Sequence, residues 1–170
     1  MQRTSHPEGG TKPRVGGLPR LALYQPDIPQ NAGTLLRLAA CLGLAVDVIG
    51  PCGFLWDDRR MRRAGMDYAA AVRVRHHSSF AVFETVRAGS SQRLVPLTTA
   101  GDRRLDDFAF AEGDIVMVGR ESAGVPDDVA AAADIGLRIP MIPGVRSLNV
   151  ALAATLAIGE ALRQMRAFPA

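Results

Sequence analysis

From residue 20 onward, short apolar runs alternate with longer amphipathic segments, and turn residues separate them. No other feature narrows the fold as much, because this alternation is typical of an α/β protein with a mostly parallel sheet flanked by helices. The apolar runs predict strands at residues 21–24, 45–49, 71–74, 93–97, 114–118 and 136–139. The amphipathic segments predict helices at residues 31–42, 57–64, 80–88, 126–133 and 147–166.

Length and composition indicate one globular domain. The 170 residues are 48% hydrophobic and 22% charged, which suits a single core. No repeat or linker interrupts residues 20–168, so we expect a flexible N-terminal tail at residues 1–20 and one domain at residues 21–170. The tail lacks the apolar run of a secretory signal. The longest apolar run, residues 150–158, is far below the roughly 18 residues of a membrane span.

The cysteines and the basic residues bear on compartment and partner. Cys41 and Cys52 show no metal-ligand spacing, which predicts a reduced, cytoplasmic protein. The short apolar runs predict no membrane partner. Lys12 is the only lysine among 20 basic residues. Arginine suits bidentate recognition of phosphate, as in RNA, but a GC-rich genome gives the same bias. The net charge of +3 permits an RNA partner without requiring one.

Ligands of open α/β sheets bind at the carboxyl ends of the strands, and three loops that follow predicted strands are unusual. The first, QPDIPQN at residues 25–31, passes through two prolines into a helix that Asn31 is predicted to cap. Arg37 follows six residues later on that helix, and we expect Asn31 and Arg37 to face one site.

The second loop, GRESAGVP, covers residues 119–126. It has glycine near both ends, as phosphate-binding loops do, but it lacks the Lys and Ser/Thr of a P-loop. Glu121 would repel a phosphate, so a neutral or cationic ligand fits better. A tight turn without a ligand needs the same glycines, so this loop alone leaves a purely structural role open.

The third loop, IPMIPGVRSLN, covers residues 139–149 and leads into the last helix. Ser147 is predicted to cap that helix, with Asn149 just inside it. A cap does not explain the apolar, proline-rich stretch before it. Such a stretch suits packing against an adenine ring while its backbone offers hydrogen bonds.

A basic cluster that includes Arg59 and Arg63 lies beside Trp56 and Tyr68. This composition suits RNA phosphates and bases, although a solvated helix face has the same pattern. The cluster is therefore a weaker candidate for substrate binding than the three loops.

Other catalytic arrangements are not supported. His76 and His77 are adjacent, so their side chains point apart, and no carboxylate or cysteine lies at metal-ligand spacing. Ser122 lies in RESAG rather than in the GxSxG of hydrolases. The sequence predicts neither a metal site nor a hydrolase triad.

The three loops together resemble the SPOUT superfamily of methyltransferases, most closely its small tRNA wobble-position 2′-O-methyltransferases. The resemblance implies a SPOUT fold with a deep C-terminal trefoil knot, a homodimer, and S-adenosyl-L-methionine as cofactor with S-adenosyl-L-homocysteine as product. It implies tRNA rather than DNA as partner, with the ribose 2′-hydroxyl of position 34 as target, on cytidine or modified uridine. The matching stretches are LALYQPDIPQNAGTLLRLAACLG, GFLWDDRRMRRAGMDY, RLVPLTTAG, DIVMVGRESAGVP, RIPMIPGVRSLNVA and GEALRQ.

Matching by motif, the resemblance assigns roles to individual residues. Catalytic roles fall to Arg37 and Asn31. Cofactor binding falls to Leu97, Thr98, Gly119, Glu121, Gly124, Ile139, Met141, Ser147 and Leu148. Substrate binding is expected of Arg37 and Asn149, which fall on the family's motifs. It is also expected of further arginines whose charge suits RNA phosphate: Arg59, Arg63, Arg120 and Arg146.

The reaction and the departures from the family refine these expectations. The attacking hydroxyl loses its proton, and arginine does not accept it because its guanidinium stays protonated. Arg37 is therefore expected to hold the neighbouring phosphate and the 2′-oxygen. Gly159 stands where close relatives carry tyrosine, and Arg120 stands where relatives often have proline, so the choice of tRNA stays open.

Three alternatives remain at this point. The first keeps the fold but moves the target to another tRNA or rRNA ribose. The second is a non-catalytic RNA-binding protein that retains the knot. The third is a nucleotide-binding domain that uses NAD or FMN, which predicts a GxGxxG turn after the first strand, where this chain has QPDIPQN.

Overall fold

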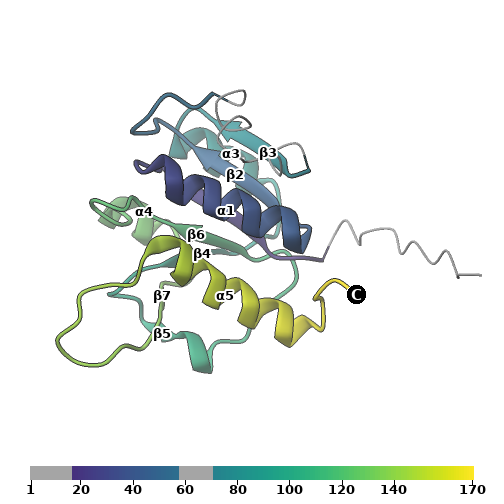
Figure 1. Cartoon of the computed structure of the whole chain (residues 1–170), viewed down its shortest axis with the longest axis vertical. Coiled ribbons are helices and arrows are strands. Elements are labelled where there is room, and N and C mark those ends of the chain that lie inside the picture. The colour runs from purple at the N-terminus through teal and green to yellow at the C-terminus, as the bar shows by residue number, and fades with distance from the viewer. Residues whose placement is uncertain (1–16, 58–70) are drawn as a thin grey trace, which may run out of the picture.

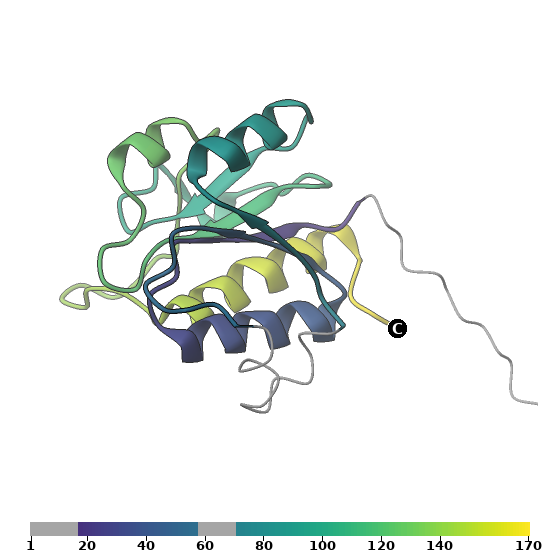
Figure 2. The same cartoon turned by 90° about the horizontal axis from the view of Figure 1, so that it is seen from above.

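The computed structural model describes residues 17–57 and 71–170. These residues form a seven-stranded sheet in the order β3-β2-β1-β6-β4-β7-β5, with helices on both faces (Figures 1 and 2). The strands are β1 (Arg20–Tyr24), β2 (Ala45–Ile49), β3 (Arg73–His77), β4 (Leu94–Leu97), β5 (Arg103–Arg104), β6 (Ile115–Val118) and β7 (Leu137–Arg138). The helices are α1 (Pro29–Leu42), α3 (Phe80–Ala88), α4 (Asp127–Ala131) and α5 (Val150–Met165), with a 3-10 turn, η2, at Leu105–Asp107.

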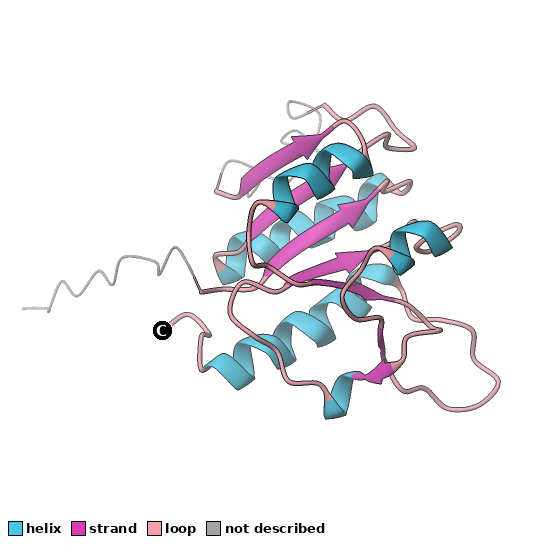
Figure 3. Cartoon of the chain, turned by 180° about the vertical axis from the view of Figure 1, so that it is seen from behind, coloured by secondary structure: helices cyan, strands magenta, loops and turns pink. Residues whose placement is uncertain are grey.

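All neighbouring strands of the sheet pair in parallel. This confirms the predicted α/β class. A helix pair, α1 and α5, lies side by side over one face, and α3 and α4 cover the other (Figures 2 and 3). The trefoil knot that the resemblance implies stays a prediction. Within the described residues, no helix has both the length and the apolar character needed to span a bilayer.

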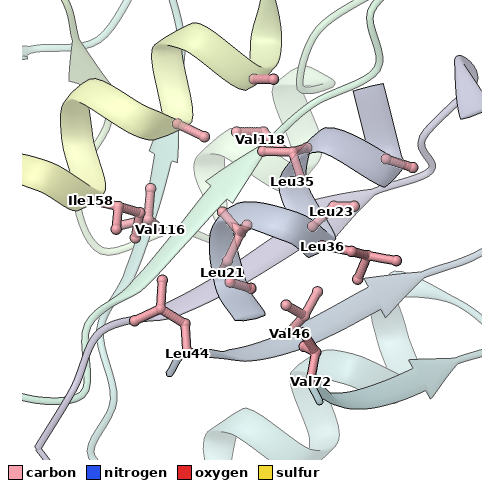
Figure 4. Packing of buried hydrophobic residues seen from close by; sticks show 14 of the residues in the cluster. Leu21, Leu23, Leu35, Leu36, Leu44, Val46, Val72, Val116, Val118 and Ile158 are labelled. Atoms are coloured by element: carbon pink, nitrogen blue, oxygen red, sulfur yellow. The ribbon is translucent and has the colours of Figure 1, made fainter. Parts of the chain in front are cut away.

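The central strands read as continuous apolar runs because both of their faces are buried. In β1, Leu21 and Leu23 face α1 and α5, whereas Ala22 and Tyr24 face α3 and α4. The larger cluster fills the space between the sheet and the α1–α5 pair (Figure 4). Its members include Leu35, Leu36, Val46, Val116, Val118 and Ile158.

The predicted strands overlap observed ones, but two edge strands differ from expectation. β3 was expected at residues 71–74 but runs over Arg73–His77. It is the outer strand and its side chains are mostly exposed and polar, so the sequence shows no alternation of apolar and polar residues that would mark its bounds. β5 has two exposed arginines and no apolar signal, so the sequence did not predict it. The predicted helix at residues 57–64 lies outside the described residues from residue 58 onward.

Two predicted helix caps are wrong. α1 begins at Pro29 with Ile28 as its N-cap, so Asn31 lies inside the first turn. Proline favours the first helical position because its fixed φ suits the helix and it has no N–H to leave unpaired. α5 is capped by Asn149 rather than by Ser147, and the Asn149 side chain accepts hydrogen bonds from the backbone of Ala151 and Leu152.

Candidate functional site

The three unusual loops meet at one pocket of about 610 Å³. They follow β1, β6 and β7, and residues 97–99, at the end of β4 and just after it, join them. The strands are parallel, so their carboxyl ends lie at the same edge of the sheet. This volume falls in the roughly 300–1,000 Å³ that is usual for small-molecule sites.

The pocket brings together most of the residues that the sequence singled out. All of the residues expected to bind the cofactor line it: Leu97, Thr98, Gly119, Glu121, Gly124, Ile139, Met141, Ser147 and Leu148. Asn31, Arg120, Arg146 and Asn149 line it as well. Arg37 is not among the lining residues and lies exposed on α1. The expectation that it shares one side of the helix with Asn31 is wrong, because six residues leave the two side chains about 120° apart around the helix. Arg59 and Arg63 lie outside the described residues.

Sequence reasoning missed pocket residues of two kinds. Val118, the last residue of β6, and Leu137, the first residue of β7, line the pocket, but their apolar character marked them only as core residues. Ile28, Ser122 and Ala123 neighbour predicted residues in the same loops. Their position in those loops was the available signal, since their side chains carry no distinctive chemistry.

The loop after β6 is a tight hairpin that tolerates only glycine at two positions. The backbones of Arg120 and Gly124 exchange hydrogen bonds of 3.0 and 2.7 Å. A Cβ atom on Gly119 would lie 2.3 Å from the Gly124 carbonyl carbon, and Gly124 has a φ of +70°. The glycines therefore have the structural role that the sequence left open, and the same hairpin forms one wall of the pocket.

Two acidic side chains from different loops contact each other at this hairpin. The Asp27 backbone N–H donates to Glu121 Oε2 at 3.0 Å, and the Glu121 backbone N–H donates to Asp27 Oδ1 at 3.0 Å. The Ser122 backbone and hydroxyl both donate to Asp27 Oδ2. Hydrogen bonding with Glu121 and Ser122 lowers the pKa of Asp27 to about 2. Burial, and then the contact with Asp27, raises the pKa of Glu121.

Two asparagines connect the first and third loops. Asn149 Nδ2 donates to Asn31 Oδ1 at 3.1 Å, while Asn149 Oδ1 caps α5. Because the Asn31 oxygen faces Asn149, its amide nitrogen remains to donate elsewhere. A hydrogen bond from Asn31 acts to lower the pKa of Glu121 against the effect of burial. Polar contacts thus join all three loops.

Arginines lie at the pocket, where they suit a polyanionic substrate. The Arg120 guanidinium lies over the Tyr24 ring at 6.0 Å from the ring centroid, which holds it by a cation–π contact. Arg146 lies on the exposed loop between β7 and α5, which reaches away from the sheet in Figure 1. Both arginines line the pocket, so they suit contacts with phosphate at its rim.

The lining residues fit S-adenosyl-L-methionine. Leu97, Ile139 and Leu148 offer an apolar surface for the adenine ring, and Glu121 offers a carboxylate for positive charge. Such a site disfavours a polyphosphate, whose charge Glu121 would repel. Among residues 17–57 and 71–170, no group of three or more His, Cys, Asp or Glu side chains is arranged to hold a metal ion.

Known proteins match this chain over most of its length. A tRNA (cytidine(34)-2′-O)-methyltransferase of Beijerinckia indica is 53% identical over 147 residues, which cover 86% of this chain and 92% of the relative. A structure solved in work on the 2-OH methylation of C/U34 on tRNA superposes with a TM-score of 0.82 at 42% identity, covering 88% of this chain and 97% of the other. The SpoU methyltransferase AviRb of Streptomyces viridochromogenes, solved with the cofactor AdoMet, has a TM-score of 0.78 at 26% identity, covering 92% of this chain and 61% of AviRb.

These matches confirm the resemblance that the three loops predicted. The family match itself covers residues 19–159, which include every strand of the sheet and every loop of the pocket. The chain belongs to the SpoU rRNA Methylase family.

Proposed function

We propose that this protein transfers the methyl group of S-adenosyl-L-methionine to the ribose 2′-hydroxyl of the tRNA wobble nucleotide, a cytidine or modified uridine at position 34. One observation carries the proposal: residues from all three family motifs line a single pocket. The proposed substrate is that of two similar proteins: the Beijerinckia indica relative is a tRNA (cytidine(34)-2′-O)-methyltransferase, and the structure with a TM-score of 0.82 was solved in work on methylation of C/U34 on tRNA. Such a substrate implies a cytoplasmic enzyme.

The pocket residues divide the binding task by chemistry. Leu97, Ile139 and Met141 hold the apolar part of the cofactor, with the backbone of the loop at residues 139–149 offering hydrogen bonds. Glu121 compensates positive charge. When bound, S-adenosyl-L-methionine supplies a methyl group activated by its sulfonium centre.

Substrate positioning falls to the arginines. Arg120 and Arg146 line the pocket and contact RNA phosphates. Arg37, exposed on α1, binds the phosphate next to the target and the 2′-oxygen, which stabilises the negative charge that develops there. Arg37 does not accept the hydroxyl proton, because a guanidinium stays protonated in proteins. Asn31 and Asn149 orient the loops around the reacting groups.

We also propose that the enzyme is a homodimer, because α5 exposes an apolar face. Leu152 and Leu156 lie one turn apart on it and are 59% and 50% exposed. Ile28 and Leu148, 41% and 39% exposed, lie at the pocket. Clustered exposed leucines on a helix favour association. A partner on this face therefore borders the pocket.

The test is methyl transfer from labelled S-adenosyl-L-methionine to tRNA from a strain that lacks the protein. Nuclease digestion and mass spectrometry then locate the label. We expect 2′-O-methylated nucleotide 34, with transfer lost in Arg37→Ala. Arg75→Ala is the matched control, since it removes an exposed arginine from the edge strand β3, and Arg75 does not line the pocket. Label at another nucleotide contradicts the proposed target, and absence of both transfer and cofactor binding contradicts the activity.

A further inference from the structure

Asp27 belongs to no group of residues that the motifs assigned, yet it joins two of the three loops. Its carboxylate accepts hydrogen bonds from the Glu121 backbone at 3.0 Å, from the Ser122 backbone at 3.3 Å and from the Ser122 hydroxyl. Its own backbone N–H donates to the Glu121 carboxylate at 3.0 Å. Segments 94 residues apart in sequence are therefore joined by a reciprocal pair of bonds.

Packing from a third segment fixes where Asp27 lies. The Gly53 backbone N–H donates to the Pro26 carbonyl at 2.9 Å. A Cβ atom on Gly53 would lie 2.7 Å from the Asp27 Cβ atom and 2.9 Å from its Cα atom. The chain after β2 thus presses directly against Asp27, and only a glycine fits there. Gly53 thus packs against the backbone and Cβ atom of Asp27, while the Asp27 carboxylate accepts hydrogen bonds from the hairpin after β6.

Asp27 itself does not line the pocket, whereas Glu121 does. The bonds to Asp27 engage both the backbone and the carboxylate of Glu121, so they determine where that side chain points. Two adjacent carboxylates normally repel each other. Here the Ser122 donors and the Glu121 N–H stabilise the charge on Asp27. Of the two acidic side chains, the one that faces a ligand in the pocket is therefore Glu121.

We propose that Asp27 is a positioning residue of the cofactor site, which holds Glu121 so that its carboxylate recognises the positive charge of the cofactor. This inference rests on the proposed function, because it takes the ligand to be S-adenosyl-L-methionine. That ligand carries two positive groups, a sulfonium and an ammonium. Asp27 acts on either of them only through Glu121.

Calorimetry with three ligands tests the inference without turnover. S-adenosyl-L-methionine has both positive groups, S-adenosyl-L-homocysteine keeps only the ammonium, and 5′-methylthioadenosine has neither. In Asp27→Ala and in Glu121→Gln, we expect the affinity for S-adenosyl-L-methionine to fall roughly tenfold to a hundredfold, because this is the usual effect of losing a hydrogen bond to a charged group. Binding of 5′-methylthioadenosine should change by less than about twofold.

The ligand pattern also identifies which positive group Glu121 recognises. A loss confined to S-adenosyl-L-methionine assigns the sulfonium, and an equal loss for S-adenosyl-L-homocysteine assigns the ammonium. Because Asp27 acts through Glu121, the double variant Asp27→Ala/Glu121→Gln should bind no more weakly than Glu121→Gln alone. Additive losses would overturn the positioning role.

Control variants separate positioning from loss of fold. Asp107→Asn removes an acid whose side chain is 76% exposed and that does not line the pocket, so it should bind all three ligands as the unmodified protein does. Thermal unfolding should show that every variant is folded at the assay temperature. An equal loss for all three ligands means that Asp27 only shapes the pocket, which overturns the proposal.

The outcomes also separate this inference from the proposed function. If the unmodified protein binds none of the three ligands, both fail. If it binds them and Asp27→Ala binds them equally well, the positioning role of Asp27 fails and the proposed function stands.

Discussion

Gln164 in α5 joins the last helix to the segment that precedes β6. Its side-chain oxygen accepts from the Phe110 backbone at 2.9 Å, and its nitrogen donates to the Phe108 carbonyl at 2.8 Å. Gln164→Ala leaves both backbone groups without a partner, so we expect the free energy of unfolding to fall by about 1–3 kcal/mol. Urea denaturation measures it. Arg163→Ala, which removes only an exposed ion pair with Glu160, should cost less than about 1 kcal/mol. Equal losses in the two variants would contradict this role.

Glu160 makes the free energy of unfolding depend on pH in the acidic range, and a single substitution isolates this contribution. The Arg163 guanidinium, followed by the Gln164 amide, lowers the pKa of Glu160 from 4.5 to about 2. A group with a lowered pKa in the folded state stabilises it above the unfolded value, and this contribution is lost as the pH falls from 4.5 toward 2. We expect Glu160→Gln to cost up to about 1 kcal/mol at pH 6, because the pair is exposed, and almost nothing near pH 2. Urea denaturation at both pH values checks this, and a constant difference would contradict it.

At the scale of elements, the start of α5 couples helix stability to the site. Asn149 caps the helix through its oxygen and contacts Asn31 through its nitrogen. Asn149→Asp keeps the cap but loses the donor, whereas Asn149→Ala loses both. We expect thermal stability to be kept in Asn149→Asp and lowered by about 1 kcal/mol in Asn149→Ala. Cofactor affinity, measured by calorimetry, should fall in both. Full affinity in Asn149→Asp would show that the contact with Asn31 is dispensable.

The sequence predicted the elements whose two faces are buried and did less well at the edges. β1 and β6 are buried almost throughout, so their apolar runs marked them clearly. Among the described strands, β5 pairs only with β7, and it exposes both of its residues, so its composition resembles a loop. Two helix starts were misplaced because local preference did not decide between Pro29 and Asn31 at α1, or between Ser147 and Asn149 at α5.

For the whole molecule, glycine and proline patterns located the three loops, and the topology brings them to one pocket. The contact between Asp27 and Glu121 could not be predicted from the sequence, because it depends on how two loops 94 residues apart approach each other. Arg37 is a different case, because the six residues that separate it from Asn31 already turn its side chain about 120° away from that of Asn31 on the helix. Side-chain contacts between distant loops leave no periodic signal.

The exposed face of α5 gives a prediction about assembly. Leu152 and Leu156 are each at least half exposed. A charged side chain at either position should therefore leave the fold of one subunit intact. We expect the pair of substitutions Leu152→Glu and Leu156→Glu to give a folded monomer in analytical ultracentrifugation, because a charged group buried in an apolar interface is costly to desolvate. Methyl transfer should fall with the loss of the dimer.

Val82 and Val86 on α3 provide the matched control, since they are 44% and 47% exposed on the opposite face of the sheet. Val82→Glu with Val86→Glu adds the same charge to a similar helical surface and should leave the protein dimeric. If both pairs of substitutions give a dimer, the partner does not sit on α5. If both give a monomer, the added charge disrupts assembly from any position, and the apolar face of α5 loses its special role. Only a monomer from the α5 pair alone assigns the interface to the face that borders the pocket.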